Sequence, residues 1–216
     1  MSAAPQFPDE QNAEGHFVRQ DDAFRDWVRA DGSTAFPPAA GRYHLYVSLA
    51  CPWAHRTIIV RRLKGLEDAI GMTVVDPIRD DEGWAFRDVP GASLDTLNGF
   101  SYLAEAYRAS DPHYHGRVTV PILWDTVTKR VVSNSDDDIM RMLEKEFDAV
   151  AKRPELDLAP ASLVPQIDAL NAHVYENVNN GVYKAGFATS QHAYEASARR
   201  VFTTLDELDA RLATSR

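Results

Sequence analysis

The sequence has only one cysteine, Cys51, among 216 residues. A single cysteine cannot form a disulfide within the chain, and it excludes a zinc site built from several cysteines. It also excludes redox chemistry in which a second cysteine of the same chain resolves the first. If Cys51 does redox work, a thiol from solution must complete the reaction. We expect no metal site.

Long apolar runs and an excess of basic residues are also lacking. No apolar stretch is long enough to span a bilayer. The formal net charge of −9 argues against non-specific nucleic-acid binding, which needs a basic surface. Residues 1–6 carry no basic cluster followed by an apolar core, so we expect no secretory signal. The expectation is a cytoplasmic protein that binds neither membranes nor nucleic acid.

The residues around Cys51 predict a strand, a tight turn and a helix. Residues 43–49 are apolar and β-prone, and Pro52 opens a helix-forming stretch that reaches Lys64. Proline suits the first helical position because its φ fits and its missing N–H is not needed there. Thiols at helix N-termini have a pKa of roughly 3.5–7.5 instead of ~8.5. We expect Cys51 to be the reactive residue; the alternative is a small buried side chain without chemistry.

The remaining pattern predicts an α/β domain followed by helices alone. A short strand at 73–75 suggests a parallel βαβ unit, and residues 117–124 and 130–133 suggest a hairpin. Residues 97–109 and the stretch after the capping residue Ser135 have helical spacing. Two further helices are expected, over about 167–178 and 191–211, with a turn at residues 179–181.

We predict three parts in the chain. An N-terminal arm covers residues 1–41 and packs Phe24, Trp27 and Val28 on the body. An α/β domain covers 42–150, with a long insertion at about 77–116. A linker with prolines at 154–165 leads to a helical region, 160–216.

This order of elements resembles that of the glutathione transferases. Ser-Leu-Ala-Cys-Pro-Trp-Ala-His-Arg at residues 48–56 resembles, more narrowly, the signature of the glutathionyl-hydroquinone reductases, the Xi class. Further stretches resemble the same family: 41–46, 64–68, 83–84, 116–121 and 179–188. The resemblance implies a thioredoxin-like α/β N-terminal domain plus an all-α C-terminal domain. The family's helical domain continues beyond the length of this chain, so we expect the C-terminal part to be incomplete.

The resemblance implies a reaction as well. The Cys51 thiolate attacks the sulfur of an S-glutathionylated hydroquinone, hydroquinone leaves, and glutathione stays on Cys51 as a mixed disulfide. A second glutathione releases oxidised glutathione. Glutathione is then a cosubstrate, small aromatic quinol conjugates are the other ligands, and the protein is a homodimer if the helical domain is complete.

Site residues carry over from the family position by position. Those implied for glutathione are Trp84, Arg117, Val118, Val120, Pro121, Ser135 and Asp136. Val120-Pro121 resembles a cis-proline turn whose first residue pairs its backbone with the cysteinyl part of glutathione, and the Arg117 guanidinium suits a carboxylate. Tyr183 matches a tyrosine that faces the hydroquinone and stabilises the leaving phenolate.

Each of these residues also has a plainer interpretation. Trp84 then packs the long loop, Arg117 forms a surface ion pair, Pro121 is a trans proline on an edge strand and Tyr183 is a core residue. For two residues near the cysteine the plainer role is the one we predict. His55 is expected to be structural or weakly electrostatic, and Arg56 to be an ion-pair partner that stabilises the fold.

The sequence departs from the family at the third helix start. The family commonly has Glu-Ser where this chain has Ser135-Asp136. Ser135 can still cap the helix and offer its hydroxyl to a carboxylate. Asp136 can pair with an ammonium group but repels a carboxylate. A low-molecular-weight thiol other than glutathione therefore stays open.

Two alternative functions stay open at this stage. The same site suits a general thiol transferase that deglutathionylates proteins or reduces dehydroascorbate. A non-catalytic module that binds a thiol or a partner protein is the third hypothesis.

Overall fold

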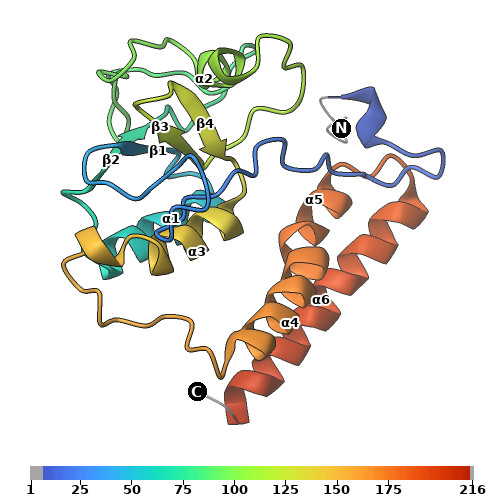
Figure 1. The fold of residues 1–216 in the computed structure, drawn as a ribbon. Helices are drawn as coiled ribbons and strands as arrows, with labels where there is room; N and C mark the ends of the chain where they lie inside the picture. The colour runs from blue at the N-terminus through green and yellow to red at the C-terminus, as the bar shows by residue number, and fades with distance from the viewer. Residues whose placement is uncertain (1–6, 215–216) are drawn as a thin grey trace. The chain divides into compact units, whose positions relative to one another are not determined.

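The computed structural model describes residues 7–214 and divides into two compact units (Figure 1). The sheet unit comprises Asp22–Leu158, and the helical unit comprises Met1–Asp21 with Ala159–Arg216. The predicted arm is thus shared between the units, and the division at Leu158 lies inside the predicted linker. Two stretches lie outside the described residues. They are residues 1–6, which were interpreted as lacking a secretory signal, and the last two residues of the predicted helical region.

The sheet unit is built on four strands in the order β2–β1–β3–β4. β1 (Tyr43–Val47) pairs in parallel with β2 (Ile70–Val74) and antiparallel with β3 (Ile122–Asp125). β3 also pairs antiparallel with β4 (Arg130–Ser133). The predicted parallel pair and hairpin are confirmed. The third strand is shorter than predicted, because Pro121 has no N–H to donate to a ladder and β3 begins after it.

Helices cover both faces of this sheet. α1 (Pro52–Leu63) packs against α3 (Asp136–Lys145) on one face, and α2 (Leu103–Ser110) lies on the other (Figure 1). A sheet covered on both sides needs apolar residues in both directions, which explains why nearly every residue of β1 and β3 is buried. This is the thioredoxin-like arrangement predicted for the first domain.

The predicted helix over 97–109 begins six residues late. Glu105 accepts hydrogen bonds from the N–H groups of Tyr102 at 2.9 Å and Ser101 at 2.8 Å, which fixes the helix start at Leu103. The preceding chain turns around the buried carboxylate of Asp95, which accepts from the Tyr46 hydroxyl at 3.0 Å. Local capping therefore overrides the helical spacing of residues 97–102.

The ends of the sheet unit are attached to its core. Val28 is buried, and Phe24 and Trp27 pack beside it, as predicted for the arm. At the other end, the buried ammonium of Lys64 lies 2.7 Å from Asp148 Oδ1, in the 3₁₀ turn η2 (Asp148–Val150), and 2.9 Å from the Leu156 carbonyl. The chain that follows α3 is thereby tied to the end of α1.

The helical unit contains α4 (Val164–Val174), the π-helical turn η3 (Tyr175–Asn179), α5 (Gly181–Gly186) and α6 (Gln191–Thr214). The turn predicted at 179–181 is wrong. The Asn180 N–H donates to the Tyr175 carbonyl at 2.9 Å, so the helix continues through a π-helical turn. The chain reverses at residues 187–190 instead.

The N-terminal segment is attached to this helical unit. It begins with the 3₁₀ turn η1 (Pro8–Glu10), and the Phe17 ring packs on Phe187 with the ring centroids 5.2 Å apart. The N–H of Thr189 also donates to the Gly15 carbonyl at 3.0 Å. Residues far apart in the sequence thus form one unit.

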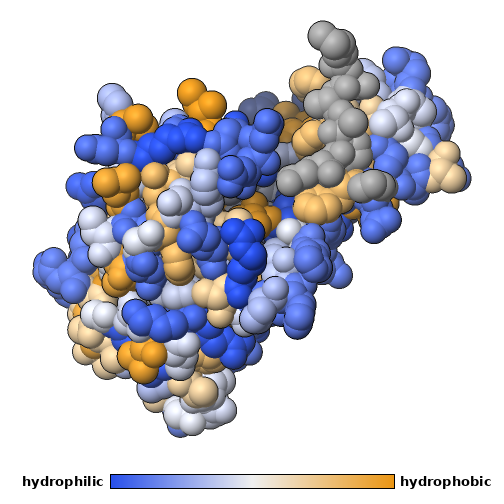
Figure 2. Space-filling view, turned by 90° about the horizontal axis from the view of Figure 1, so that it is seen from above, coloured by the Kyte–Doolittle hydropathy of each residue, from blue (hydrophilic) through white to orange (hydrophobic). Residues whose placement is uncertain are grey.

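Apolar side chains also reach the surface. On the face seen in Figure 2, hydrophobic residues lie in small groups among hydrophilic ones. The exposed apolar side chains of the described residues include Leu49, Ile78, Val127, Phe202 and Leu212. Within residues 7–214, the helices are too short or too polar to cross a membrane.

A buried ion pair anchors the far end of β3. Asp125 is fully buried and accepts from Arg42 Nε at 2.9 Å and Nη2 at 2.7 Å. Burial alone would raise the pKa of the Asp125 carboxyl, but hydrogen bonds from Arg42, Thr128 and the Val127 N–H lower it below its usual value. A carboxyl with a lowered folded-state pKa stabilises the fold fully above its unfolded pKa of ~3.9 and loses that contribution as the pH falls through the folded value.

We expect Asp125→Asn to lower the free energy of unfolding at pH 7 by about 3 kcal/mol, because it leaves Arg42 without its charged partner. The difference from the wild type should shrink below pH ~4, where the wild-type carboxyl also becomes neutral. Urea unfolding at pH 7 and across the acid range measures both effects. The matched control is Asp88→Asn at an exposed position. An equal loss in the two variants would contradict this account.

Candidate active site

Cys51 lies at the N-terminus of α1. It is the N-cap residue, with the extended backbone angles φ −101° and ψ 113°, and Pro52 follows in the first turn. Its carbonyl accepts the first helical hydrogen bond, from the His55 N–H at 3.1 Å. The thiol is half-buried, and its side chain does not cap the helix. The sulfur therefore lies beside a helix N-terminus, as predicted.

The turn before β3 faces this sulfur. The Val120-Pro121 peptide bond is cis, as predicted. Cys51 Sγ donates to the Val120 carbonyl oxygen at 3.6 Å. Two segments separated by 69 positions in the sequence thus meet at the cysteine.

The start of α3 is the third element of the site. Ser135 is its N-cap, and the Oγ atom accepts from the Asp138 N–H at 3.3 Å. Asp136 is buried and pairs with Arg56, whose Nη1 lies 3.1 Å from Asp136 Oδ2. The Nη2 atom of Arg56 lies 3.3 Å from Asp137 Oδ1. The predicted ion-pair role of Arg56 is confirmed, and its partners show that α1 is joined to the first turn of α3.

Trp84 and Arg117 are half-buried, and a third residue links them. The guanidinium carbon of Arg79 lies 5.3 Å from the Trp84 ring centroid. Burial, and then the positive charge of Arg117, lowers the pKa of Arg79. The side chains of Arg79 and Arg117 thus place two positive charges near Trp84, which was predicted to contact glutathione. Sequence reasoning missed Arg79; the only signal was a basic residue in an otherwise acidic stretch.

The remaining predicted residues lie at different depths. Val118 is half-buried against the core, and His55 is exposed one helical turn after Cys51. Tyr183 is in α5 of the helical unit, where its ring stacks on Phe187 at 6.3 Å and the Arg19 guanidinium lies 5.9 Å from its centroid. Its contact with a hydroquinone stays a prediction. Within residues 7–214, no three His, Cys, Asp or Glu side chains cluster in a way that could hold a metal ion.

Comparison with known proteins matches the part of the chain that holds most of these site residues. The sequence pattern of the glutathione S-transferase N-terminal domain matches residues 50–146. The crystal structure of the glutathione S-transferase Xi from Phanerochaete chrysosporium is 46% identical, with a TM-score of 0.88 over 92% of this chain and 68% of that one. The chain belongs to the Xi class of glutathione transferases.

The sequence and the solved structure of one bacterial protein support this assignment to the Xi class. Glutathionyl-hydroquinone reductase YqjG of Escherichia coli K12 is 49% identical over 208 residues, which cover 93% of this chain and 63% of YqjG. The glutathione-bound structure of YqjG has a TM-score of 0.84 at 50% identity, over 90% of this chain and 65% of that one. The chain thus spans a little under two thirds of the length of this curated relative. The family resemblance predicted from residues 48–56 is confirmed.

In this Xi-class chain, Arg56 and Asp136 can be tested as a coupled pair. We expect Arg56→Met to lower the free energy of unfolding by about 1–3 kcal/mol, because it leaves the buried Asp136 carboxylate without its charged partner. Asp136→Asn combined with Arg56→Met should cost less than the sum of the single changes, with a coupling of about 1 kcal/mol in urea unfolding. The control is Asp26→Asn, which removes an exposed pair with Arg130 and should cost less than about 1 kcal/mol. Strict additivity would show that the pair does not join the two helix starts.

Proposed function

We propose that this Xi-class protein reduces glutathionyl-hydroquinones to hydroquinones with glutathione, through a mixed disulfide on Cys51. One observation carries the proposal: the only sulfhydryl of the chain stands at the N-terminus of α1, 3.6 Å from the Val120 carbonyl, in a sequence 49% identical to a glutathionyl-hydroquinone reductase. Unpaired N–H groups and the dipole at a helix N-terminus stabilise negative charge on such a sulfur.

In the first step the Cys51 thiolate attacks the sulfur that joins glutathione to the aromatic ring. A sulfur–sulfur bond forms, the carbon–sulfur bond breaks, and the ring carbon takes up a proton as hydroquinone leaves. In the second step the thiolate of a free glutathione attacks the mixed disulfide. Oxidised glutathione leaves, and Cys51 returns as a thiolate. The two electrons that reduce the aromatic product come from two glutathione molecules, so no second protein cysteine is needed.

The surrounding residues have separate roles in this proposal. The Val120 backbone, whose carbonyl already contacts Sγ, binds the cysteinyl part of glutathione beside Pro121. Arg117, next to Val118, attracts a glutathione carboxylate near Trp84, and Arg79 adds a second positive charge there. Ser135 and Asp136 at the start of α3 bind the γ-glutamyl end. Tyr183 of the helical unit donates to a quinol oxygen and stabilises the leaving phenolate.

Two further proposals concern the assembly of the protein, which the family implies, and its location, which was expected from the sequence. We infer that the functional form is a homodimer when the helical domain is complete, and that the protein works in the cytoplasm. Size-exclusion chromatography with light scattering on a protein that carries the complete helical domain tests the first of these.

Intact mass spectrometry tests the mixed disulfide directly. After incubation with one equivalent of a glutathionyl-hydroquinone and no free glutathione, we expect a single glutathione adduct on the wild type and an equal amount of released hydroquinone. Cys51→Ser should give neither product. Addition of free glutathione should then remove the adduct and produce oxidised glutathione. A parallel incubation with glutathione disulfide separates this reductase from a general thiol transferase, which would form the adduct equally fast from the small disulfide.

Two outcomes would oppose the proposal. Hydroquinone release that is unaffected by Cys51→Ser would exclude the cysteine as the attacking group. The second outcome is a folded wild type that forms no adduct with the glutathione conjugate but forms one with the conjugate of a different thiol. This result would show that the other thiol is the cosubstrate, and the reaction at Cys51 would be unchanged.

The protonation state of Cys51 can be measured without any substrate. We expect the rate of alkylation by iodoacetamide to rise with a midpoint clearly below pH 8.5, the ordinary value for a free thiol, because only the thiolate reacts. The same chain in guanidinium chloride is the matched control and should titrate near pH 8.5, since it has the same single thiol without the helix. Identical midpoints in the folded and unfolded chain would remove the helix N-terminus as the source of reactivity.

A further inference from the structure

Three aromatic rings of the sheet unit meet beside the segment that leads to the Val120-Pro121 turn. The ring centroid of Phe24 lies 5.6 Å from that of Tyr107 and 5.6 Å from that of Tyr114, and the two tyrosine centroids are 5.0 Å apart. Tyr107 belongs to α2, and Tyr114 to the loop that follows it. Rings at these separations attract one another and restrict each other's orientation. The cluster therefore determines where the two tyrosine hydroxyls lie.

The Tyr107 hydroxyl is bonded to the main chain of Thr119. It donates to the Thr119 carbonyl oxygen at 3.0 Å and accepts from the Thr119 N–H at 3.2 Å. Tyr107 is fully buried, and burial raises the pKa of its hydroxyl above the ordinary value, so the donor keeps its proton. Thr119 lies before β3, which begins at Ile122, so a side chain takes the place of a strand partner for its main-chain groups.

Tyr114 holds the same segment two residues earlier. Its hydroxyl donates to the Arg117 carbonyl oxygen at 2.6 Å, and burial raises the pKa of this hydroxyl to about 12. Gly116 permits the close approach of the ring, because a Cβ atom at this position would lie 2.7 Å from the Tyr114 hydroxyl oxygen. A larger residue at position 116 would displace the tyrosine from the segment.

Asn134 connects the same segment to the N-terminal arm. Its Nδ2 atom donates to Thr119 Oγ1 at 3.4 Å, and its Oδ1 atom accepts from the Phe24 N–H at 2.9 Å. Asn134 is buried and directly precedes Ser135, the N-cap of α3. The arm, α2 and the residue before the α3 cap thus reach one short stretch of main chain, residues 117–120.

We propose that Tyr107 and Tyr114 are positioning residues for the thiol cosubstrate, because their hydroxyls fix the main chain of residues 117–120. This role rests on the proposed function, in which that segment binds glutathione. The Tyr107 bonds hold the residue next to Val120, and the Tyr114 bond holds Arg117. A segment that is already ordered loses less conformational freedom when a ligand binds, so the two hydroxyls raise the affinity for glutathione while acting only through the main chain.

S-methylglutathione is the probe, because its blocked sulfur cannot form a disulfide with Cys51. Tyr107→Phe keeps the ring of the cluster and removes only the hydroxyl. We expect this variant to weaken S-methylglutathione about fivefold in isothermal titration, which corresponds to the loss of one neutral hydrogen bond. Tyr114→Phe should weaken the ligand by a similar factor, and the double variant should bind more weakly than either single one.

The matched control is Tyr43→Phe in the same unit. The Tyr43 hydroxyl donates to the Pro37 carbonyl oxygen at 2.9 Å, so this variant also loses a bond from a tyrosine to the main chain. It should lower the urea midpoint as Tyr107→Phe does, but leave the dissociation constant of S-methylglutathione unchanged. The comparison separates positioning of the segment from a general loss of stability.

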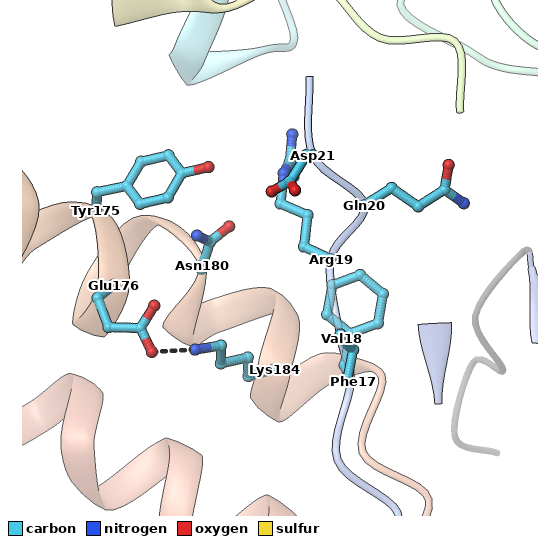
Figure 3. Close-up of a pocket in the computed structure, with 9 residues that line it drawn as sticks. All are labelled: Phe17, Val18, Arg19, Gln20, Asp21, Tyr175, Glu176, Asn180 and Lys184. Carbon is cyan, nitrogen blue, oxygen red and sulfur yellow. Dashed lines mark hydrogen bonds and ion pairs between the residues drawn. The ribbon is translucent and has the colours of Figure 1, made fainter. Parts of the chain in front are cut away.

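A second control lies in the helical unit, which has a cavity of about 320 Å³ between residues 17–21 and 175–184 (Figure 3). The residues that line this cavity belong to the helical unit, and Figure 3 shows the ion pair of Lys184 with Glu176 in its wall. Glu176→Gln removes that pair without touching residues 117–120. It should therefore leave the binding of S-methylglutathione unchanged.

The possible outcomes are distinct. Equal dissociation constants for the wild type and both tyrosine variants would overturn the positioning role and leave the proposed function intact. An equal loss of binding in Tyr43→Phe would also overturn it. A folded wild type that does not bind S-methylglutathione would exclude glutathione as the ligand, and the role would fall with the proposed function. Circular dichroism checks folding, and if Tyr107→Phe does not fold, Tyr114→Phe at its half-buried position decides the question.

Discussion

The ion pair between Arg56 and Asp136 joins the first turn of α3 to the helix that begins at Cys51. Arg56 lies five residues after the cysteine, so the pair fixes the α3 start relative to the sulfur. The Asp136 side chain is only 7% exposed, whereas that of Arg56 is 30% exposed. Such a pair is screened less than a surface pair, and losing Arg56 leaves the Asp136 carboxylate as a poorly solvated charge. The contact that we propose between the α3 start and the γ-glutamyl end of glutathione depends on this spacing.

The sheet holds the remaining part of the site. β3 has four residues and spans about 13 Å. Asp125 at its end is held by Arg42, and the residue that precedes Pro121 at its beginning faces the cysteine. A short, fully buried strand that is fixed at one end has little freedom at the other. The position of the Val120 carbonyl beside Sγ therefore follows from the packing of the sheet core, far from the sulfur itself.

The elements that the sequence predicted well depend on local residue types. Pro52 after Cys51 marks a helix start, and Ser135 before three aspartates marks another. In both places the cap and the first turn are contiguous in the sequence. The hairpin of β3 and β4 is similarly local, since a short turn joins the two strands.

The features that sequence reasoning missed depend on less local interactions. The turn expected at 179–181 is a π-helical turn, because Asn-Asn-Gly is a common turn signal and nothing in it specifies the bond from Asn180 back to Tyr175. Arg79 lies outside the stretches that resemble the family, and its place beside Trp84 follows from the path of the long loop. The cavity of the helical unit needs residues 17–21 and 175–184 together, a pairing that helical periodicity does not encode.

Ser135-Asp136 differs from the Glu-Ser pair that is common in the family, and the partners of Asp136 change the expected effect of this difference on glutathione binding. A lone carboxylate at a helix N-terminus would repel the carboxylate of an incoming γ-glutamyl group. Here Arg56 lies 3.1 Å from that carboxylate, and its charge offsets the negative charge of Asp136. The γ-glutamyl end of glutathione carries an ammonium group as well as a carboxylate. A helix start that presents Asp136, Arg56 and main-chain N–H groups offers both signs of charge within a few ångströms, which is the complement of a zwitterion. If the α3 start binds glutathione, as we propose, the Ser-Asp pair together with Arg56 therefore still offers a partner for each charge of the γ-glutamyl group.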